Sequence, residues 1–202
     1  MKLRLIGVVT IVALGWCLWP LTAAAQKFAI TTLAEKKLKT LPEGPLYWRI
    51  ETFPTLFDAE AAAGPTGLAA EATGKVWLFT LGPKGGSTPG GSKIVEIGPV
   101  PPFAAPEYLL RIIQSGGPPG AKTPIHTHPG SEAFYVLAGE QTQRTPHGVT
   151  RLEGGQFLPG HGPDTVMEVS SSGTTDLDQF VMFLVDATRP FTSPAEFPSA
   201  QR

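Results

Sequence analysis

The stretch Gly120-Ala-Lys-Thr-Pro-Ile-His126-Thr-His128-Pro-Gly-Ser-Glu132-Ala-Phe-Tyr-Val-Leu-Ala-Gly139 carries the pattern that decides the fold. Alternate side chains of a β-strand share a face, so His126 and His128 point together while Thr127 points away. Pro129-Gly-Ser131 is typical of a turn, after which Glu132 rejoins the same interior on the next strand. Two neutral imidazoles and one carboxylate suit Mn, Fe, Ni, Cu, Co or Zn, and open positions remain for water or substrate. The stretch therefore predicts one divalent transition metal inside a small β-barrel.

This stretch resembles the first motif of the cupin superfamily, G-x5-H-x-H-x3-E-x6-G. Every fixed position is matched, by Gly120, His126, His128, Glu132 and Gly139. The resemblance covers about residues 105 to 188 and implies an all-β fold, the double-stranded β-helix or cupin jelly-roll barrel. It also implies that the two histidines and the glutamate bind the metal.

The second cupin motif, roughly G-x5-P-x-G-x2-H-x3-N, is matched only in part. If Pro159 is the motif proline, the histidine position falls on Asp164; if Gly162 is the motif glycine, it falls on Thr165. His161 lies three or four residues earlier, in a glycine-flanked turn that is able to place a side chain out of strand register. The fourth metal ligand is therefore left open, with His161 the first candidate.

Three further residues are candidates for binding or catalysis. Strand alternation places Phe134 on the same face as Glu132, so its ring is expected to line the pocket. Arg111 is a candidate anchor for a carboxylate substrate, and Asp164 is a candidate acid or base, or a group that orients a histidine. The remaining wall is expected to be apolar, which favours a small, partly hydrophobic ligand over a large polar sugar.

The N-terminus has the pattern of a signal peptide. Lys2 and Arg4 precede an almost entirely apolar run, and small residues then lead to a cleavage site expected after Ala25. Cys17 lies in the apolar run, so the mature chain is expected to contain no cysteine, which fits a bacterial periplasm or secretion. The net charge of −1 gives no indication of nucleic acid or, after cleavage, of a membrane as partner.

The sequence divides into a signal peptide (1–25), an N-terminal extension (26–104), the metal-binding barrel (105–188) and a C-terminal tail (189–202). In the extension we expect an arm over 27–45 that packs on the barrel or mediates association, for example as a homodimer. We also expect extra strands, a short helix and loop over 56–72, and a flexible Gly/Pro-rich hairpin loop over 82–92. The tail is expected to lie over the surface.

Three hypotheses for function follow. The first is an exported metal-binding cupin that acts as a small-molecule metalloenzyme such as an oxygenase, because a 2-His-1-carboxylate site with open positions binds O₂ or a chelating substrate. The second is a non-catalytic protein that binds or stores a small ligand, with a structural metal. The third is a metal-dependent isomerase or lyase, in which the ion acts as a Lewis acid.

Overall fold

The structure is a computed structural model that describes residues 27–198. The predicted signal peptide therefore lies outside the described residues. Antiparallel strands and one short helix make up the described chain, as expected for an all-β protein. Within residues 27–198, no helix has the length and apolar character needed to span a membrane.

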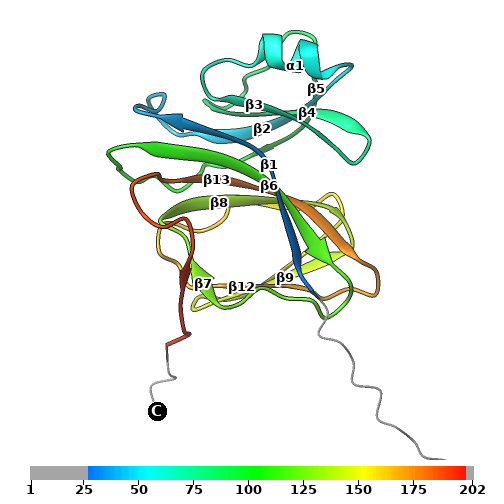
Figure 1. Cartoon of the computed structure of the whole chain (residues 1–202), viewed down its shortest axis with the longest axis vertical. Helices are drawn as coiled ribbons and strands as arrows, with labels where there is room; N and C mark the ends of the chain where they lie inside the picture. The colour runs from blue at the N-terminus through cyan, green and yellow to red at the C-terminus, as the bar shows by residue number, and fades with distance from the viewer. Residues whose placement is uncertain (1–26, 199–202) are drawn as a thin grey trace, which may run out of the picture.

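A five-stranded antiparallel sheet forms the middle layer of the molecule (Figure 1). Its strand order is β1-β6-β13-β8-β11. The strands are β1 (Ala29–Leu38), β6 (Tyr108–Gly117), β13 (Leu177–Asp186), β8 (Gly130–Ala138) and β11 (Phe157–Leu158). The predicted N-terminal arm is thus an edge strand of this sheet, paired with β6 along its length.

A second layer closes the barrel below this sheet. It contains β10 (Gly148–Glu153), β9 (Glu140–Thr145) and β12 (Glu168–Ser171), in that order. Strand β7 (His126–Thr127) lies beside the start of β12, because His126 and Met167 exchange both backbone hydrogen bonds (3.0 and 2.9 Å). Most connections between β6 and β13 cross from one sheet to the other. This is the jelly-roll or double-stranded β-helix topology, as predicted.

The N-terminal extension adds a third layer on the outer face of the middle sheet (Figure 1). Its four-stranded sheet has the order β3-β4-β2-β5. The elements are β2 (Tyr47–Phe53), α1 (Leu56–Ala62), β3 (Gly67–Ala72), β4 (Lys75–Gly82) and β5 (Ser92–Ile97). Residues 56–72, predicted to form a short helix and loop, therefore contain the helix α1 and the strand β3.

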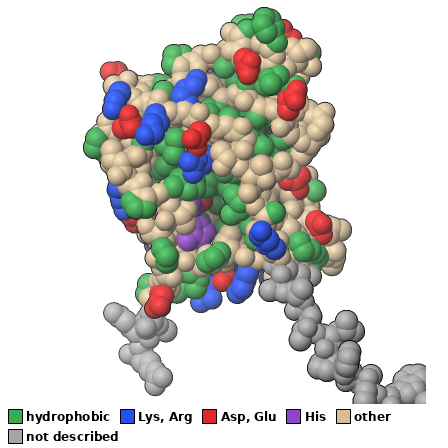
Figure 2. Space-filling model, in the orientation of Figure 1, with side chains coloured by type: hydrophobic (Ala, Val, Ile, Leu, Met, Phe, Trp, Pro, Cys, Tyr) green, Lys and Arg blue, Asp and Glu red, His purple; other side chains and the backbone are tan. Residues whose placement is uncertain are grey.

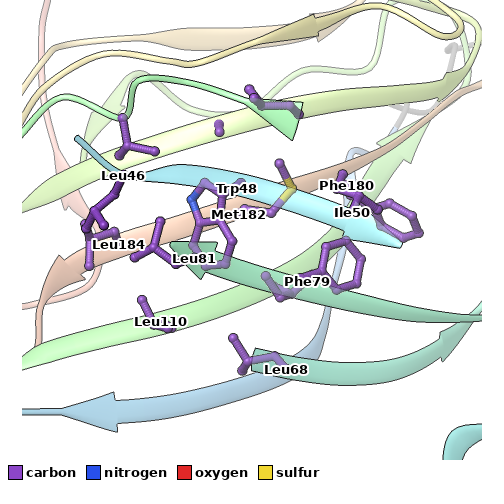
Figure 3. Packing of buried hydrophobic residues seen from close by; sticks show 14 of the residues in the cluster. Leu46, Trp48, Ile50, Leu68, Phe79, Leu81, Leu110, Phe180, Met182 and Leu184 are labelled. Carbon is purple, nitrogen blue, oxygen red and sulfur yellow. The ribbon is translucent and has the colours of Figure 1, made fainter. Parts of the chain in front are cut away.

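The largest core fills the space between the N-terminal sheet and the middle sheet (Figure 3). Trp77 and Phe79 of β4 each meet the ring of Phe180 edge-on, with ring centroids 5.0 and 5.1 Å apart. A separate core fills the barrel, where Val181 and Phe183 of β13 point inward. Because β13 is covered on both faces, its sequence is almost continuously apolar instead of alternating.

The glycine- and proline-rich segment 83–91 is not a hairpin loop. β4 and β5 do not pair with each other; both pair with β2, so the segment passes across the end of that strand. Thr88 fixes the segment to the sheet, because its backbone N–H and its hydroxyl both donate to the buried Glu51 carboxylate (2.9 and 2.6 Å). Sequence composition indicated a loop but carried no information on this contact.

The tail also has a defined place. Strand β14 (Ser193–Pro194) pairs with β7, with Pro194 opposite His126. The tail therefore runs along the strand that carries His126 and directly precedes His128, which is more specific than a tail lying over the surface.

Candidate metal centre

A cavity of about 370 Å³ enters the barrel beside β7. His126, His128 and Glu132 all line it, so the structure brings the three residues of the first motif into one site. Figure 2 shows histidine side chains in a hollow of the molecular surface. Most of the remaining wall is apolar, and Phe134 contributes to it as the strand alternation predicted.

Backbone carbonyl groups hold both imidazole rings. Nδ1 of His126 lies 2.8 Å from the carbonyl oxygen of Pro124, and Nδ1 of His128 lies 2.6 Å from that of Phe191. A carbonyl oxygen only accepts, so each Nδ1 is the protonated nitrogen and each Nε2 keeps a free lone pair. The rings are close, with centroids 4.9 Å apart and planes at 83°. Both side chains are therefore in the tautomer that binds a metal through Nε2.

Glu132 is buried, with 3% of its surface exposed. Its Oε1 has no hydrogen-bond partner, and its Oε2 lies 4.0 Å from Nε2 of His128. Burial raises the pKa of the Glu132 carboxyl to about 8. Burial also lowers the pKa of His128 to about 4, against the opposing effect of the Phe191 carbonyl, and lowers the pKa of His126. Near pH 7 the 4.0 Å contact thus joins two neutral groups and is not an ion pair.

Two glycines take part in close backbone approaches along β8, and one of these is at Glu132. A Cβ at Gly160, which has φ +82°, would collide with the carbonyl oxygen of Glu132, so the loop after β11 approaches this backbone as only glycine allows. At the end of β8, Gly139 of the motif has φ +75° and packs against the backbone of Asp176. These close approaches give a physical reason for glycine at both positions.

His161, the first candidate for the fourth ligand, lies elsewhere. It does not line the cavity, and its Nε2 lies 3.1 Å from Oε1 of Gln143. Its nearest aromatic neighbour is His147, in the β9–β10 turn, at a centroid distance of 6.5 Å. The residue opposite His126 on the adjoining strand is Met167. His161 is therefore not among the residues that line the cavity with His126, His128 and Glu132.

Asp164 and Thr165, the alternatives for the fourth position, are also engaged outside the cavity. Asp164 has φ +59°, and its backbone N–H donates to the carbonyl oxygen of His128 (2.8 Å). Its carboxylate accepts two hydrogen bonds from Arg189, at 3.1 and 2.7 Å. The Thr165 hydroxyl donates to the carbonyl oxygen of Gly162. Asp164 thus shapes the turn behind His128 and lies away from the cavity wall.

Arg111 supports the site from outside. Its guanidinium pairs with Glu35 (2.7 Å) and lies over the ring of Phe191, 4.1 Å from the centroid. Phe191 in turn packs against His128, at 4.9 Å between ring centroids. Arg111 therefore helps to hold the segment that orients His128, and its charge contributes to the lowered pKa of His128. It does not line the cavity in this structure, and its role as a substrate anchor stays a prediction.

Sequence reasoning missed two contributors to the site. The carbonyl of Phe191 orients His128, but any residue provides a carbonyl, so no signal in the sequence marks it. Gln179 lines the cavity from β13 with 1% of its surface exposed. A detectable signal existed for Gln179, because it is a polar residue at an inward position of an otherwise apolar strand.

Comparisons with known proteins give likenesses of fold. No family model matches the chain, and no curated protein sequence matches it. Among solved structures, a cupin-like protein from Thermotoga maritima is 16% identical over 45% of this chain and 68% of its own, with a TM-score of 0.39. A double-stranded β-helix protein from Klebsiella pneumoniae is 25% identical over 43% and 75%, with a TM-score of 0.37.

A third solved structure is the DMSP lyase DddQ from Ruegeria pomeroyi, 22% identical over 42% of this chain, with a TM-score of 0.36. This chain spans 42% of that lyase's length. Two features belong to this chain itself: the crossing of strands between two antiparallel sheets, and the complete first motif, whose residues lie in and beside β7 and β8. On those features, the barrel of this protein has the cupin jelly-roll fold.

Proposed function

We propose that this protein binds one divalent transition metal through His126, His128 and Glu132 and acts as a metalloenzyme on a small, largely apolar molecule. The observation that carries the proposal is the unpartnered Oε1 of the buried Glu132, in the same cavity as two imidazoles with free Nε2 atoms. A buried carboxylate oxygen without a donor is unfavourable unless a proton or a cation compensates it.

The donor set fits such an ion in its chemistry. Two neutral imidazoles and a carboxylate are suited to Mn, Fe, Co, Ni, Cu or Zn, and three protein ligands leave positions for other molecules. Across the described residues, no group of three His, Cys, Asp or Glu side chains is already arranged to hold an ion. Binding would therefore need side-chain rotations. These would be small, because Nε2 of His128 already lies 4.0 Å from Oε2 of Glu132.

Each group around the cavity would have a distinct role in such an enzyme. The carbonyls of Pro124 and Phe191 keep the Nδ1 protons in place, so that Nε2 stays free as a ligand. The apolar wall, including Phe134 and Phe183, excludes water and strengthens electrostatic interactions in the cavity. A bound ion of this ligand type supplies O₂ binding or Lewis-acid polarisation of a substrate oxygen. Of these chemistries we propose oxidation of the substrate with O₂ first.

Metal content tests the first part of the proposal. The purified mature protein, reconstituted with each of the six metals in turn and desalted, is expected to keep about one ion per chain by elemental analysis. The double variant His126→Ala/His128→Ala is expected to lose it. His147→Ala is the matched control, because His147 is exposed in the β9–β10 turn, away from the cavity. A folded wild-type protein that retains none of the six metals would overturn the proposal.

Oxygen uptake tests the second part. The iron-loaded protein, screened against small aromatic and aliphatic substrates, is expected to consume O₂ with at least one of them. Glu132→Gln should abolish the uptake while His147→Ala keeps it. Metal retention without O₂ uptake in the whole screen would remove the oxygenase assignment and leave the metal site.

A further inference from the structure

The cavity has a second polar end, away from the histidines. Gln179, Val181 and Phe183 are inward residues of β13 and all line the cavity. Phe183 is opposite Glu132 of β8, whereas Gln179 is opposite Ser115 of β6. Gln179 lies four residues before Phe183 in β13, so the two positions are about 13 Å apart along the strand at the usual rise per residue. The cavity is therefore elongated along β13.

Gln179 and Ser115 form a buried pair at that end. The Gln179 side chain is 1% exposed and Ser115 is 5% exposed, and both line the cavity. Nε2 of Gln179 donates to Oγ of Ser115 (3.3 Å), which fixes the amide and leaves Oε1 as an acceptor. This Oε1 is buried and has no partner among the described residues. An acceptor fixed in an apolar wall with no internal donor is the kind of group that orients a ligand.

The wall between the two polar ends is mostly apolar, and Ile113, Phe134, Val169 and Val181 line it. Two threonines also line the cavity, but the Thr123 hydroxyl accepts from the backbone N–H of Val169, and the Thr192 hydroxyl lies 3.5 Å from Nδ1 of His128. A molecule that fills the cavity is therefore expected to have a mainly apolar body, with polar groups toward Gln179 and the motif residues.

We propose that Gln179, positioned by Ser115, is the specificity-determining residue of the cavity. It would accept a hydrogen bond from a hydroxyl or amine at the far end of an elongated, mainly apolar ligand. The other end of that ligand would lie at His126, His128 and Glu132, and this part rests on the proposed function. The contact with Gln179 needs no metal, so the two proposals are separable.

The test compares two probes of similar shape, 2-naphthol and 2-methoxynaphthalene, on the full mature chain after chelation of metal. Only 2-naphthol has a donor hydrogen. Calorimetric titration of the wild type is expected to give at least tenfold tighter binding of 2-naphthol, which corresponds to about 1.4 kcal/mol. Gln179→Met keeps the approximate volume of the side chain and should bring the ratio of the two affinities to near one.

Gln141→Met is the matched control. Gln141 is also a buried glutamine with unpartnered side-chain atoms, but it does not line the cavity. Its replacement should leave the tenfold preference unchanged. Circular dichroism and thermal melting establish that each variant is folded. If Gln179→Met does not fold, Ser115→Ala takes its place, because loss of the hydroxyl releases the amide and should reduce the preference at least threefold.

Three results would overturn the inference: equal affinity of the wild type for both probes, a tenfold preference that is unchanged in the folded Gln179→Met or Ser115→Ala variant, or no binding of either probe. Because the probes are compared without metal, a failed metal proposal leaves a positive result intact. Conversely, a protein that retains its ion but shows no preference would lose only this inference.

Discussion

Replacing Glu132 with glutamine should remove a pH dependence from the folding stability of the metal-free protein. Burial raises the pKa of Glu132 to about 8, from 4.5 for an exposed glutamate. The folded state therefore keeps a proton on Glu132 at pH values where the unfolded state has released it. The free energy of unfolding then decreases as the pH rises through this range.

The histidines limit the pH window in which the effect is seen. The pKa of His128 is lowered to about 4, from 6.5. Below pH 6.5 the unfolded state therefore gains protons that the folded state does not, and stability decreases as the pH falls. This opposes the effect of Glu132, and His126, whose pKa is also lowered, acts in the same direction as His128. No other titratable side chain among the described residues lines the cavity. The window for Glu132 alone is thus pH 6.5 to 8.

The expected magnitude follows from the linkage relation. One proton of difference between the two states changes stability by about 1.4 kcal/mol per pH unit. Over the window, the wild type should lose roughly 2 kcal/mol that Glu132→Gln does not lose, since a glutamine does not ionise. Urea unfolding in the presence of EDTA measures this, with fluorescence of the buried Trp48 and Trp77 as the signal.

Glu153→Gln is the control for this experiment, because Glu153 is exposed on β10. Its stability curve should run parallel to that of the wild type. Parallel curves for the wild type and Glu132→Gln between pH 6.5 and 8 would refute the reasoning, because they would show that Glu132 ionises equally in both states.

Other expectations follow from the same contacts. Phe180→Ala should lower the free energy of unfolding by about 3–5 kcal/mol by urea titration, because it removes the ring that joins the two sheets; no loss would contradict that packing. Deletion of 189–202 should weaken metal affinity by roughly 10- to 100-fold, since His128 loses its carbonyl partner. His161→Ala should change that affinity less than the deletion does, and a larger loss would restore His161 as the fourth ligand. Mass spectrometry of the native protein should find Gln26 as the first residue.

Sequence alone predicted the barrel and the three residues that share its cavity. The reason is that these features are local: strand alternation places His126 and His128 on one face, and a short turn returns Glu132 to the same interior. The sequence did not predict the sheet that covers the outer face of β13, because the covering strands come from a distant part of the chain, residues 47–97.

Only the tertiary structure decided the surroundings of the site. The carbonyl of Phe191 holds His128 from the far end of the chain, and Asp164 pairs with Arg189 outside the cavity. His161, the predicted fourth ligand, forms a hydrogen bond with Gln143 and does not line the cavity. Such contacts depend on which segments meet in space, and a backbone carbonyl or a loop approach leaves no trace in residue spacing. The sequence therefore determined which residues of the first motif share the cavity, and tertiary packing determined which other residues reach it.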